Sequence, residues 1–425
     1  MKIISVRTVD SFLASVTSKT SKTPKNNKKV VESIIYDVQR NGDRAVRKYE
    51  KKFANATIGS LKVSKKEIRD AYSKITREQL DAIKIAKNRL YKTESTLKKR
   101  LQSITITTDG TTIKKSFIPI SSVGCYVPGG LAQYPSTAVM SVVPAKVAGV
   151  KRIVVVSPPH KDGKLEPLTL VAADLCGSDE IYKTGGVQAI TALSFGTRSI
   201  SKVDKIVGPG GPFVTMAKSI VSDKTAIDMI AGPTELAIIA DTSADPILVA
   251  NDLISQAEHS IDTSCYLVTT SESFAQKVRD AVEQKLRKIK RGKIVRQSLE
   301  TNGFLAICKS NDIIKLINEL APEHLEIITK NPQRFASKIK TAGLVLIGKN
   351  TPSAASDYLL GSNHILPTSR FGKTRGSLSV LDFMKLNTQI ESSKASLYKI
   401  SKYIRVLTSA ENLPNHYEAV RSRLQ

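Results

Sequence analysis

The sequence predicts an α/β fold of two or more domains built on parallel sheets. Its 425 residues exceed the roughly 100–200 residues of one ordinary domain. From Ile104 onward, short runs rich in β-branched residues alternate with segments of helical periodicity, such as PFVTMAKSIV and FAQKVRDAVEQKL. This alternation indicates parallel sheets that helices cover on both faces. The hydrophobic content of 41% is sufficient to fill such cores.

Residues 27–101 are predicted to form helices. Apolar residues recur at helical spacing on both sides of Gly42, which interrupts the pattern. These positions are Val30, Val31, Ile34, Ile35 and Val38 before the glycine, and Ala45, Val46 and Tyr49 after it. A second helix-rich stretch runs from Lys65 to Leu101, and a short polar linker separates the two stretches.

A β-hairpin is predicted next, because Asp109–Gly110 is a favoured turn pair between two runs of strand-forming residues. Eight further runs predict strands: RIVVVS, EIYKTG, KIVG, LAIIAD, CYLVTT, FLAIC, LEIIT and LVLIG. The residues after 379 are predicted to form a helical tail with a polar face.

The chain is strongly basic, with 65 Lys and Arg residues against 38 Asp and Glu residues and a formal net charge of +27. Clustered basic side chains would indicate a nucleic-acid partner, because they neutralise phosphates. Here the basic residues are spread along polar-faced segments, and aromatic residues do not interleave with them. We therefore favour a lysine-rich surface that keeps the protein in solution. Salt-sensitive binding of DNA or RNA would support the alternative.

The four cysteines lie far apart and include no CxxC pair, which argues against a thiolate zinc site and a disulfide framework. Cys176, Cys265 and Cys308 lie in apolar runs and are expected to be buried. Cys125 is the only cysteine close to a candidate site residue. No stretch approaches 18 apolar residues, so we expect a cytoplasmic protein without a membrane partner.

Histidine is scarce, and only five are present. His160 lies in the loop SPPHKDG and is expected to be solvated. Gln256 and His259 stand three positions apart in SQAEH, so on a helix both side chains point from one face and can reach one metal. The alternative is a hydrogen-bonded histidine at a helix boundary.

Glu323 and His324 are adjacent in APEHLEI, just before a predicted strand. This pairing suits base catalysis, because the carboxylate can draw a proton from water while the histidine accepts one from an alcohol. Two exposed polar residues in a turn are the alternative.

Three further candidates lie toward the C-terminus. Asp357 and His364 follow the predicted strand LVLIG in a polar loop, and open α/β sheets place ligands at the carboxyl ends of strands. His416 lies in ENLPNHYEAV, five residues after Glu411. Gln, His, Asp and His side chains would form a site typical of zinc or a harder divalent metal. Sequence spacing does not show whether they converge.

Three glycine loops could approach a nucleotide: VPGG at 127–130, TGG at 184–186 and GPGGP at 208–212. Glycine lets a backbone come close to a pyrophosphate. None of the loops matches GxGxxG, and ordinary strand-to-helix turns remain the alternative.

Eight motifs in this order resemble histidinol dehydrogenase: GCYVPGG, YPSTAVMSVVPAKVAGV, GGVQAITALSFGT, VDKIVGPG, IDMIAGPTE, DLISQAEH, APEHLEI and SDYLLGSNHILPT. The resemblance covers essentially the whole chain. It implies two incomplete, Rossmann-like parallel-sheet domains of the aldehyde-dehydrogenase-like fold, with small helical segments at both termini. We expect an N-terminal segment at 1–22, a first domain at 23–125 and 235–378, a second, NAD-binding domain at 126–234, and a C-terminal segment at 379–425.

The resemblance also implies the residues of the site. One Zn2+ per subunit would be bound by Gln256, His259, Asp357 and His416, while Glu323 and His324 would transfer protons. The implied substrate contacts are Thr234, Gln256, His259, His324, Asp357, His364, Glu411 and His416. The implied NAD contacts are Tyr126, Gln188 and Gly211.

The chain departs from the family pattern at three of its positions. Gly211 stands where the family usually has Asn, which removes a side-chain hydrogen bond to NAD. Thr234 replaces the usual Ser and keeps the hydroxyl, and Ser356 stands for a common Gly before Asp357.

The activity implied by the resemblance is oxidation of L-histidinol to L-histidine through bound L-histidinaldehyde, with two hydride transfers to NAD, the last step of histidine biosynthesis. The resemblance further implies a homodimer with shared active sites, in which Glu411 and His416 act in the partner's site. The nearest alternative is a paralogue that acts on another amino alcohol or diol, such as a sulfopropanediol dehydrogenase. Glu411 favours histidinol, because the substrate carries a charged amine.

Overall fold

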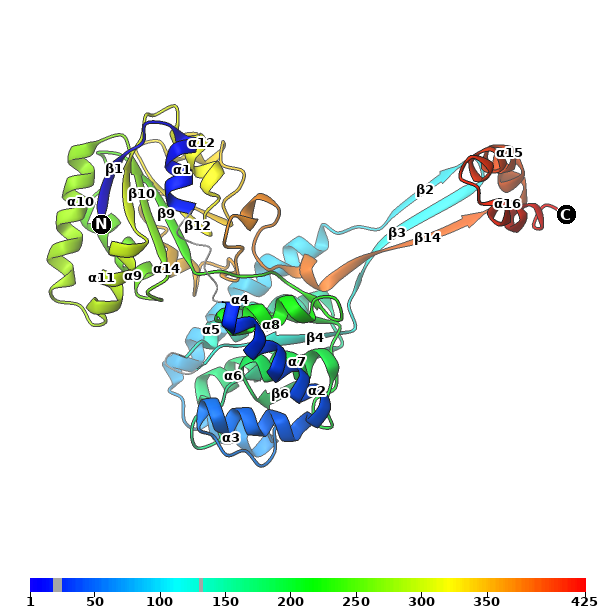
Figure 1. Cartoon of the computed structure of the whole chain (residues 1–425), viewed down its shortest axis with the longest axis horizontal. Coiled ribbons are helices and arrows are strands. Elements are labelled where there is room, and N and C mark those ends of the chain that lie inside the picture. Colours follow the sequence, from blue (N-terminus) through cyan, green and yellow to red (C-terminus); the bar gives the residue numbers. More distant parts are fainter. Residues whose placement is uncertain (18–24, 130–132) are drawn as a thin grey trace.

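The computed structural model describes residues 1–17, 25–129 and 133–425. Figure 1 shows two lobes, each built around a sheet, and a long arm that ends in two helices. The predicted α/β class with two parallel-sheet units is confirmed. Gly130 of the VPGG loop and the boundary expected after residue 22 lie outside the described residues.

The first lobe (residues 1–17 and 235–357) contains a six-stranded, all-parallel sheet. Its strands, in spatial order, are β1 (Lys2–Ser5), β11 (Phe304–Ile307), β10 (Ser264–Thr269), β9 (Glu235–Ala240), β12 (His324–Ile328) and β13 (Leu344–Ile347). Alternate residues of a strand point to opposite faces. Leu236 and Ile238 therefore pack in one core with α9 (Pro246–Ala257), α10 (Glu272–Leu286) and α11 (Gly292–Thr301). Ala237 and Ile239 pack in the other core, with α1 (Val9–Thr17), α12 (Ile313–Leu320) and α13 (Pro332–Ala336).

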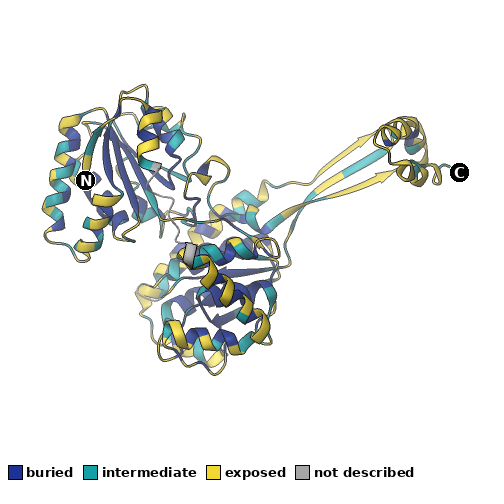
Figure 2. Ribbon diagram, viewed as in Figure 1, coloured by how far each residue is buried: buried dark blue, intermediate teal, exposed yellow. Residues whose placement is uncertain are grey.

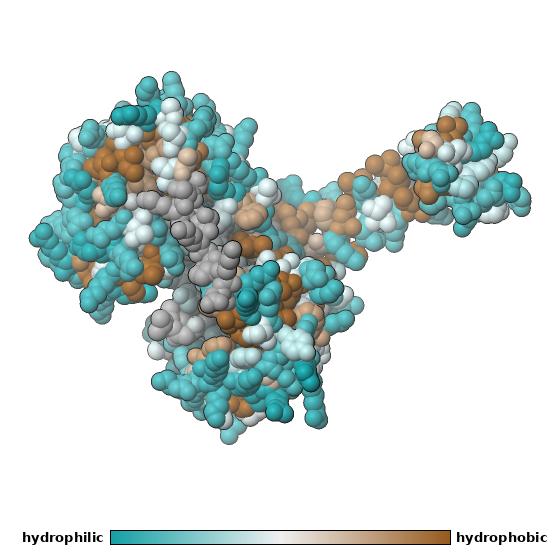
Figure 3. Space-filling view, viewed as in Figure 1, coloured by the Kyte–Doolittle hydropathy of each residue, from teal (hydrophilic) through white to brown (hydrophobic). Residues whose placement is uncertain are grey.

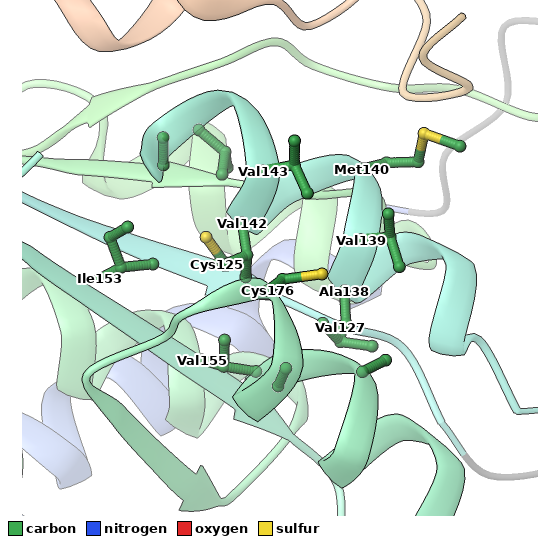
Figure 4. Packing of buried hydrophobic residues seen from close by; sticks show 14 of the residues in the cluster. Cys125, Val127, Ala138, Val139, Met140, Val142, Val143, Ile153, Val155 and Cys176 are labelled. Carbon is green, nitrogen blue, oxygen red and sulfur yellow. The ribbon is translucent and has the colours of Figure 1, made fainter. Parts of the chain in front are cut away.

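The second lobe (residues 25–103 and 120–230) contains a five-stranded parallel sheet. Its strands, in spatial order, are β6 (Glu180–Lys183), β5 (Arg152–Ser157), β4 (Ser122–Tyr126), β7 (Lys205–Val207) and β8 (Ala226–Ile227). One face packs against α2 (Lys25–Ala54), α7 (Gly186–Phe195) and α8 (Pro212–Val221). The other packs against α3 (Lys65–Tyr72), α4 (Arg77–Lys99), α5 (Pro135–Ala148) and α6 (Pro167–Cys176). Figure 4 shows this second core, where Val142 of α5 lies near Cys125 of β4.

The arm is an antiparallel ribbon of three strands in the order β14 (Met384–Ser392), β3 (Thr111–Pro119) and β2 (Ile104–Thr108). Its tip carries α15 (Lys394–Ala410) and α16 (Pro414–Arg421), well away from both lobes (Figure 1). Figure 2 shows that most of this arm is exposed or only partly buried. Short helices α14 (Ser353–Ser356), η1 (Phe371–Lys373) and η2 (Val380–Phe383) lie in the C-terminal part of the chain before the arm.

Most predicted elements are present. The hairpin around Asp109–Gly110 and all eight predicted strands are confirmed, and α2 changes direction at Gly42, whose φ is 52°. The prediction that the tail after 379 is helical is wrong for residues 384–392, which form β14. This segment pairs along the whole of β3, and that long-range partner leaves no local signal. None of the described helices is long and apolar enough to cross a membrane.

The expected division of the chain differs from the observed packing. Residues 25–99, expected in the first domain, form helices that pack on the second sheet. Strand β1 does not form a separate segment, because Lys2–Ser5 pairs with β11 in the first sheet. Both differences arise from contacts between segments that are distant in sequence.

Gly208, directly after β7, is held on both sides. Its N–H donates to Asp228 Oδ2 (2.8 Å), and its carbonyl accepts from Lys218 Nζ (2.9 Å). Lys218 and Asp228 form a buried ion pair at 2.5 Å. Gly208 has a φ of 114°, and a Cβ there would overlap the Tyr126 carbonyl oxygen. A glycine is therefore required at this turn.

We predict that Gly208→Ala lowers the free energy of unfolding by about 1–3 kcal/mol or more, because the cost of the strained backbone adds to the cost of the steric overlap. Gly211→Ala is the matched control in the same loop. It has no neighbour within 4 Å of a built Cβ, so its change should stay within about 0.5 kcal/mol. Urea denaturation of both variants checks this, and equal stabilities would contradict it.

Candidate active site

The two lobes meet at a site formed by the amino-terminal edge of the first sheet and the start of α5. His324 and Leu236 are paired at this edge, near the beginning of β12 and β9. The segment after α14 bridges to the second lobe, where His364 Nε2 lies 3.3 Å from Thr137 Oγ1 and Asn363 Nδ2 donates to the Met140 carbonyl (2.7 Å). The prediction of a site at the carboxyl end of LVLIG therefore needs correction. Helix α14 returns the chain to the opposite edge, where it packs against α9.

Glu323 and His324 are both buried, which excludes the alternative of two exposed turn residues. The chain enters β12 through Ala321, whose φ of 45° ends α12 and turns the strand inward. Glu323 Oε2 accepts a hydrogen bond from the backbone N–H of Glu235 (2.9 Å). Its other neighbour is the ring of His324, with Nδ1 3.8 Å from Glu323 Oε2.

His324 lies between two carboxylates. Its Nε2 is 3.4 Å from Asp357 Oδ1, opposite the contact with Glu323. Burial lowers the pKa of His324, but Glu323 and Asp357 outweigh burial and raise it to about 9. Burial raises the pKa of Glu323 to about 7, although His324 opposes this shift. A carboxyl and an imidazole with such pKa values can exchange protons near neutral pH.

Gln256 and Asp357 are connected through Ser353, the first residue of α14. The Ser353 hydroxyl donates to Gln256 Oε1 (3.3 Å), while the Ser353 carbonyl accepts from the Asp357 N–H (3.1 Å). Glu326 of β12 accepts from the Ser353 N–H (2.6 Å). Gln256 Nε2 and Asp357 Oδ1 remain buried without a hydrogen-bond partner.

His259 and His364 border the same cluster. The prediction that Gln256 and His259 share a helix is wrong for His259, because helix α9 ends at Ala257; His259 is exposed, and its N–H donates to the Gln256 carbonyl (3.2 Å). His364 Nδ1 donates to the Asp357 carbonyl (2.7 Å), and burial lowers the pKa of its ring. Thr234 directly precedes β9, and its carbonyl accepts from Ser264 N–H (2.9 Å).

The donor set fits a zinc ion in part. Gln256, His259 and Asp357 supply oxygen and nitrogen donors, and unpartnered buried atoms are what a missing cation would leave. Within the described ranges, no three His, Cys, Asp or Glu side chains are close enough to hold a metal. The fourth implied ligand, His416, is exposed on α16 at the tip of the arm, and Glu411 is exposed at the end of α15 (Figure 1). The structure does not bring these two residues to the site of their own chain.

The carboxyl edge of the second sheet carries the implied NAD contacts. Strand order reverses between β4 and β7, which is where open α/β sheets bind ligands. Tyr126 ends β4, and its hydroxyl accepts from Gly186 N–H (3.1 Å) at the start of α7. On α7, Gln188 Nε2 donates to the buried Glu50 (2.7 Å). Gly211 is exposed at the start of α8, with open space around it. Of the three implied contacts, Gly211 is exposed at this edge, whereas Tyr126 and Gln188 are buried beneath it.

Other candidates are not part of the site. His160 is exposed and lies 3.3 Å from Glu166, as expected for a surface residue. All four cysteines are free and buried, and burial raises the pKa of Cys125 to about 12, so its thiol is not a nucleophile.

Sequence reasoning missed several residues that support the site. The backbone N–H of Glu235 donates to Glu323, and Glu326 accepts from the first residue of α14. The hydroxyl of that residue, Ser353, donates to Gln256. Glu50 accepts from Thr184, Gly185 and Gln188 at the NAD edge. A glutamate inside a strand of apolar residues, as in LEIIT, was the one available signal, because a buried carboxylate requires a specific partner.

Two parallel-sheet lobes that meet at a buried acid–base pair define an α/β enzyme. The chain belongs to the histidinol dehydrogenase family, a family of oxidoreductases, and the family's sequence profile matches residues 17–424. This match confirms membership of the family that the sequence motifs resemble.

Individual relatives agree with this assignment. The chain is 43% identical over 395 residues to histidinol dehydrogenase of Methanocaldococcus jannaschii, covering 93% of this chain and 92% of the relative. It is 42% identical over 400 residues to that of Clostridium acetobutylicum, with coverage of 93% and 92%. The crystal structure of histidinol dehydrogenase from Elizabethkingia anophelis superposes with a TM-score of 0.94 at 35% identity, covering 100% of this chain and 98% of that one.

Glu326 is expected to make the stability of the fold depend on pH. Burial, together with the neighbouring Asp252, raises its pKa to about 8, above the ordinary value of 4.5. A group with a raised folded pKa stabilises the fold fully below its unfolded pKa and loses that contribution as pH rises through the folded pKa. In the presence of a metal chelator, the free energy of unfolding of Glu326→Gln should therefore rise relative to that of the parent protein as the pH increases from 5 to 9. The expected change is on the order of 1 kcal/mol or more.

Urea denaturation at several pH values measures this difference. Glu180→Gln is the control, because the hydrogen bond from Arg152 lowers the pKa of Glu180, so the effect of its loss should stay constant between pH 6 and 9. A flat difference for Glu326→Gln would contradict the predicted titration.

Proposed function

We propose that the protein oxidises L-histidinol to L-histidine through bound L-histidinaldehyde, with a zinc ion and NAD, in histidine biosynthesis. The observation that carries the proposal is the convergence of Glu323, His324, Asp357 and Gln256, which are distant in sequence, in one buried cluster. Family membership supplies the substrate, because the relatives are named histidinol dehydrogenases.

Gln256, His259 and Asp357 would hold the zinc ion, with His416 of a second copy as the fourth ligand. A zinc ion bound there would act as a Lewis acid that fixes the amine and imidazole of the substrate. Thr234 and His364 border the cluster and would contact the substrate. Glu411 of the second copy would face its charged amine.

His324 is proposed to take the proton of the substrate alcohol in the first oxidation. Its two carboxylate neighbours support this role, because they hold the ring in place and stabilise the imidazolium that forms. Glu323 is proposed to activate water that adds to the aldehyde. The resulting diol can lose a second hydride and a proton to give the carboxylic acid, which releases a further proton to yield the carboxylate of histidine.

Tyr126, Gln188 and Gly211 are proposed to contact NAD, which supplies the hydride acceptor for both oxidations. Gly211 contributes backbone only, so the side-chain hydrogen bond of the usual Asn is absent here. The contacts of Glu50 with Gln188 and of Tyr126 with Gly186 hold this edge in place without a ligand.

We further propose a homodimer with shared active sites. The arm and its helices expose large apolar side chains that a monomer would leave in water: Ile104, Ile106, Leu386, Ile390, Tyr398, Tyr403, Val406 and Leu407. Figure 3 shows apolar side chains along the arm. A second copy covering this surface would also receive His416 and Glu411.

We predict that each L-histidinol yields two NADH when zinc is present, because both oxidations occur in one site. After treatment with a chelator, turnover should fall to near zero and return on addition of zinc. Absorbance of NADH after exhaustive conversion measures the yield. One NADH per substrate would contradict the hydration role of Glu323.

Glu323→Gln is expected to lower kcat by about 10²–10⁴-fold, the usual contribution of general base catalysis. Glu258→Gln is the matched control, because Glu258 is exposed and lies beside His259 outside the cluster. Turnover of a sulfonated diol without turnover of histidinol would favour the paralogue.

A further inference from the structure

Ser353 contacts two of the proposed zinc ligands, Gln256 and Asp357, and a third residue, Glu326, through three different atoms. Its N–H donates to Glu326 (2.6 Å), its hydroxyl donates to Gln256 Oε1 (3.3 Å), and its carbonyl accepts from Asp357 (3.1 Å). Ser353 itself is fully buried. No other serine in the cluster joins both Gln256 and Asp357 in this way within the described part of the chain.

The Gln256 amide presents the wrong atom for a metal. A cation binds the amide oxygen, yet Oε1 faces the Ser353 hydroxyl, and the unpartnered buried atom is Nε2. Rotating the amide by half a turn exchanges the two atoms. Oε1 then occupies the unpartnered position, and Nε2 faces Ser353 Oγ, which can accept because a hydroxyl oxygen has two lone pairs.

The Ser353 hydroxyl needs another acceptor for its proton once the amide has turned. The Glu326 carboxyl group already accepts the Ser353 N–H (2.6 Å), and its second oxygen is buried without a hydrogen-bond partner, so it is the acceptor that the structure offers. A chain of hydrogen bonds from Gln256 Nε2 to Ser353 Oγ, and from Ser353 Oγ to Glu326, would give the amide nitrogen a partner and leave Oε1 for the metal.

We propose that Ser353 is a positioning residue that selects the oxygen of the Gln256 amide for the metal. The inference rests on the proposed zinc site and adds the residue that orients one of its ligands. Buried partners of metal ligands are expected to set affinity in this way, because an unpaired amide N–H would cost free energy in the alternative orientation.

The test is zinc affinity, measured by competition with a chromogenic chelator on the full-length protein. Ser353→Ala should weaken zinc binding by about 10–100-fold, the usual effect of losing a partner of a metal ligand. Ser356→Ala is the matched control. Ser356 is a buried serine of the same helix, but its hydroxyl donates to the Ser353 carbonyl (2.7 Å) and does not contact Gln256. Its zinc affinity should stay within about threefold of the parent.

Gln256→Glu separates orientation from simple support. A carboxylate presents oxygen at both positions and needs no selection, so Ser353→Ala should cost less than about threefold in this background. An equal loss in both backgrounds would overturn the proposal, as would unchanged affinity of Ser353→Ala alone. If Ser353→Ala does not fold, Ser353→Cys, whose sulfur is a weak acceptor, serves in the same comparison. Absence of zinc binding by the parent protein would overturn the proposed zinc site and this inference with it.

Discussion

The antiparallel pairing of β14 with β3 constrains where the C-terminal helices can act. Nine consecutive residue pairs, from Met384–Pro119 to Ser392–Thr111, hold the two strands together, and Ser393 N–H then donates to the Gly110 carbonyl (3.0 Å) at the turn of the arm. Helices α15 and α16 are therefore fixed at the tip of the ribbon. Returning His416 to the lobes of its own chain would break this ladder, so a second copy is the partner that the geometry favours.

The remainder of the site is prepared within one chain. Helix α14 and the segment after it bring Asp357 and His364 from beyond β13 to the edge where β12 begins, and Thr137 and Met140 of the other lobe hold that segment. Burial and neighbouring charges then set the properties of the polar groups. Burial raises the pKa of Glu323 to about 7, whereas the carboxylates of Glu323 and Asp357 raise the pKa of His324 to about 9, and Gln256 Nε2 is buried without a hydrogen-bond partner. Burial of these polar groups lowers the stability of the fold, but it also shifts the pKa values on which the proposed proton transfers depend.

The sequence predicted the elements of the fold well wherever the signal was local. The β-branched runs became strands, and Asp109–Gly110 became the turn of the arm, because these signals depend on neighbouring residues. Strand β14 and the packing of residues 25–99 on the second sheet were missed, since both depend on partners far along the chain. Within the site, the motif resemblance identified Gln256, Glu323 and Asp357, and the structure brings them together. Ser353 had no signal, because a serine in a polar loop is ordinary until its three contacts are known.

Combining two inactive variants in one dimer tests most directly whether each active site is formed by residues of two chains. His416→Ala keeps an intact lobe site but an altered arm, whereas Glu323→Gln keeps an intact arm but an altered lobe site. If the arm serves the partner, a heterodimer contains one native site. Coexpression in equal amounts should then restore about a quarter of parental histidinol oxidation, because half of the dimers are mixed and half of their sites are native. Activity no higher than that of either variant alone would show that each chain uses its own arm, and would contradict the account.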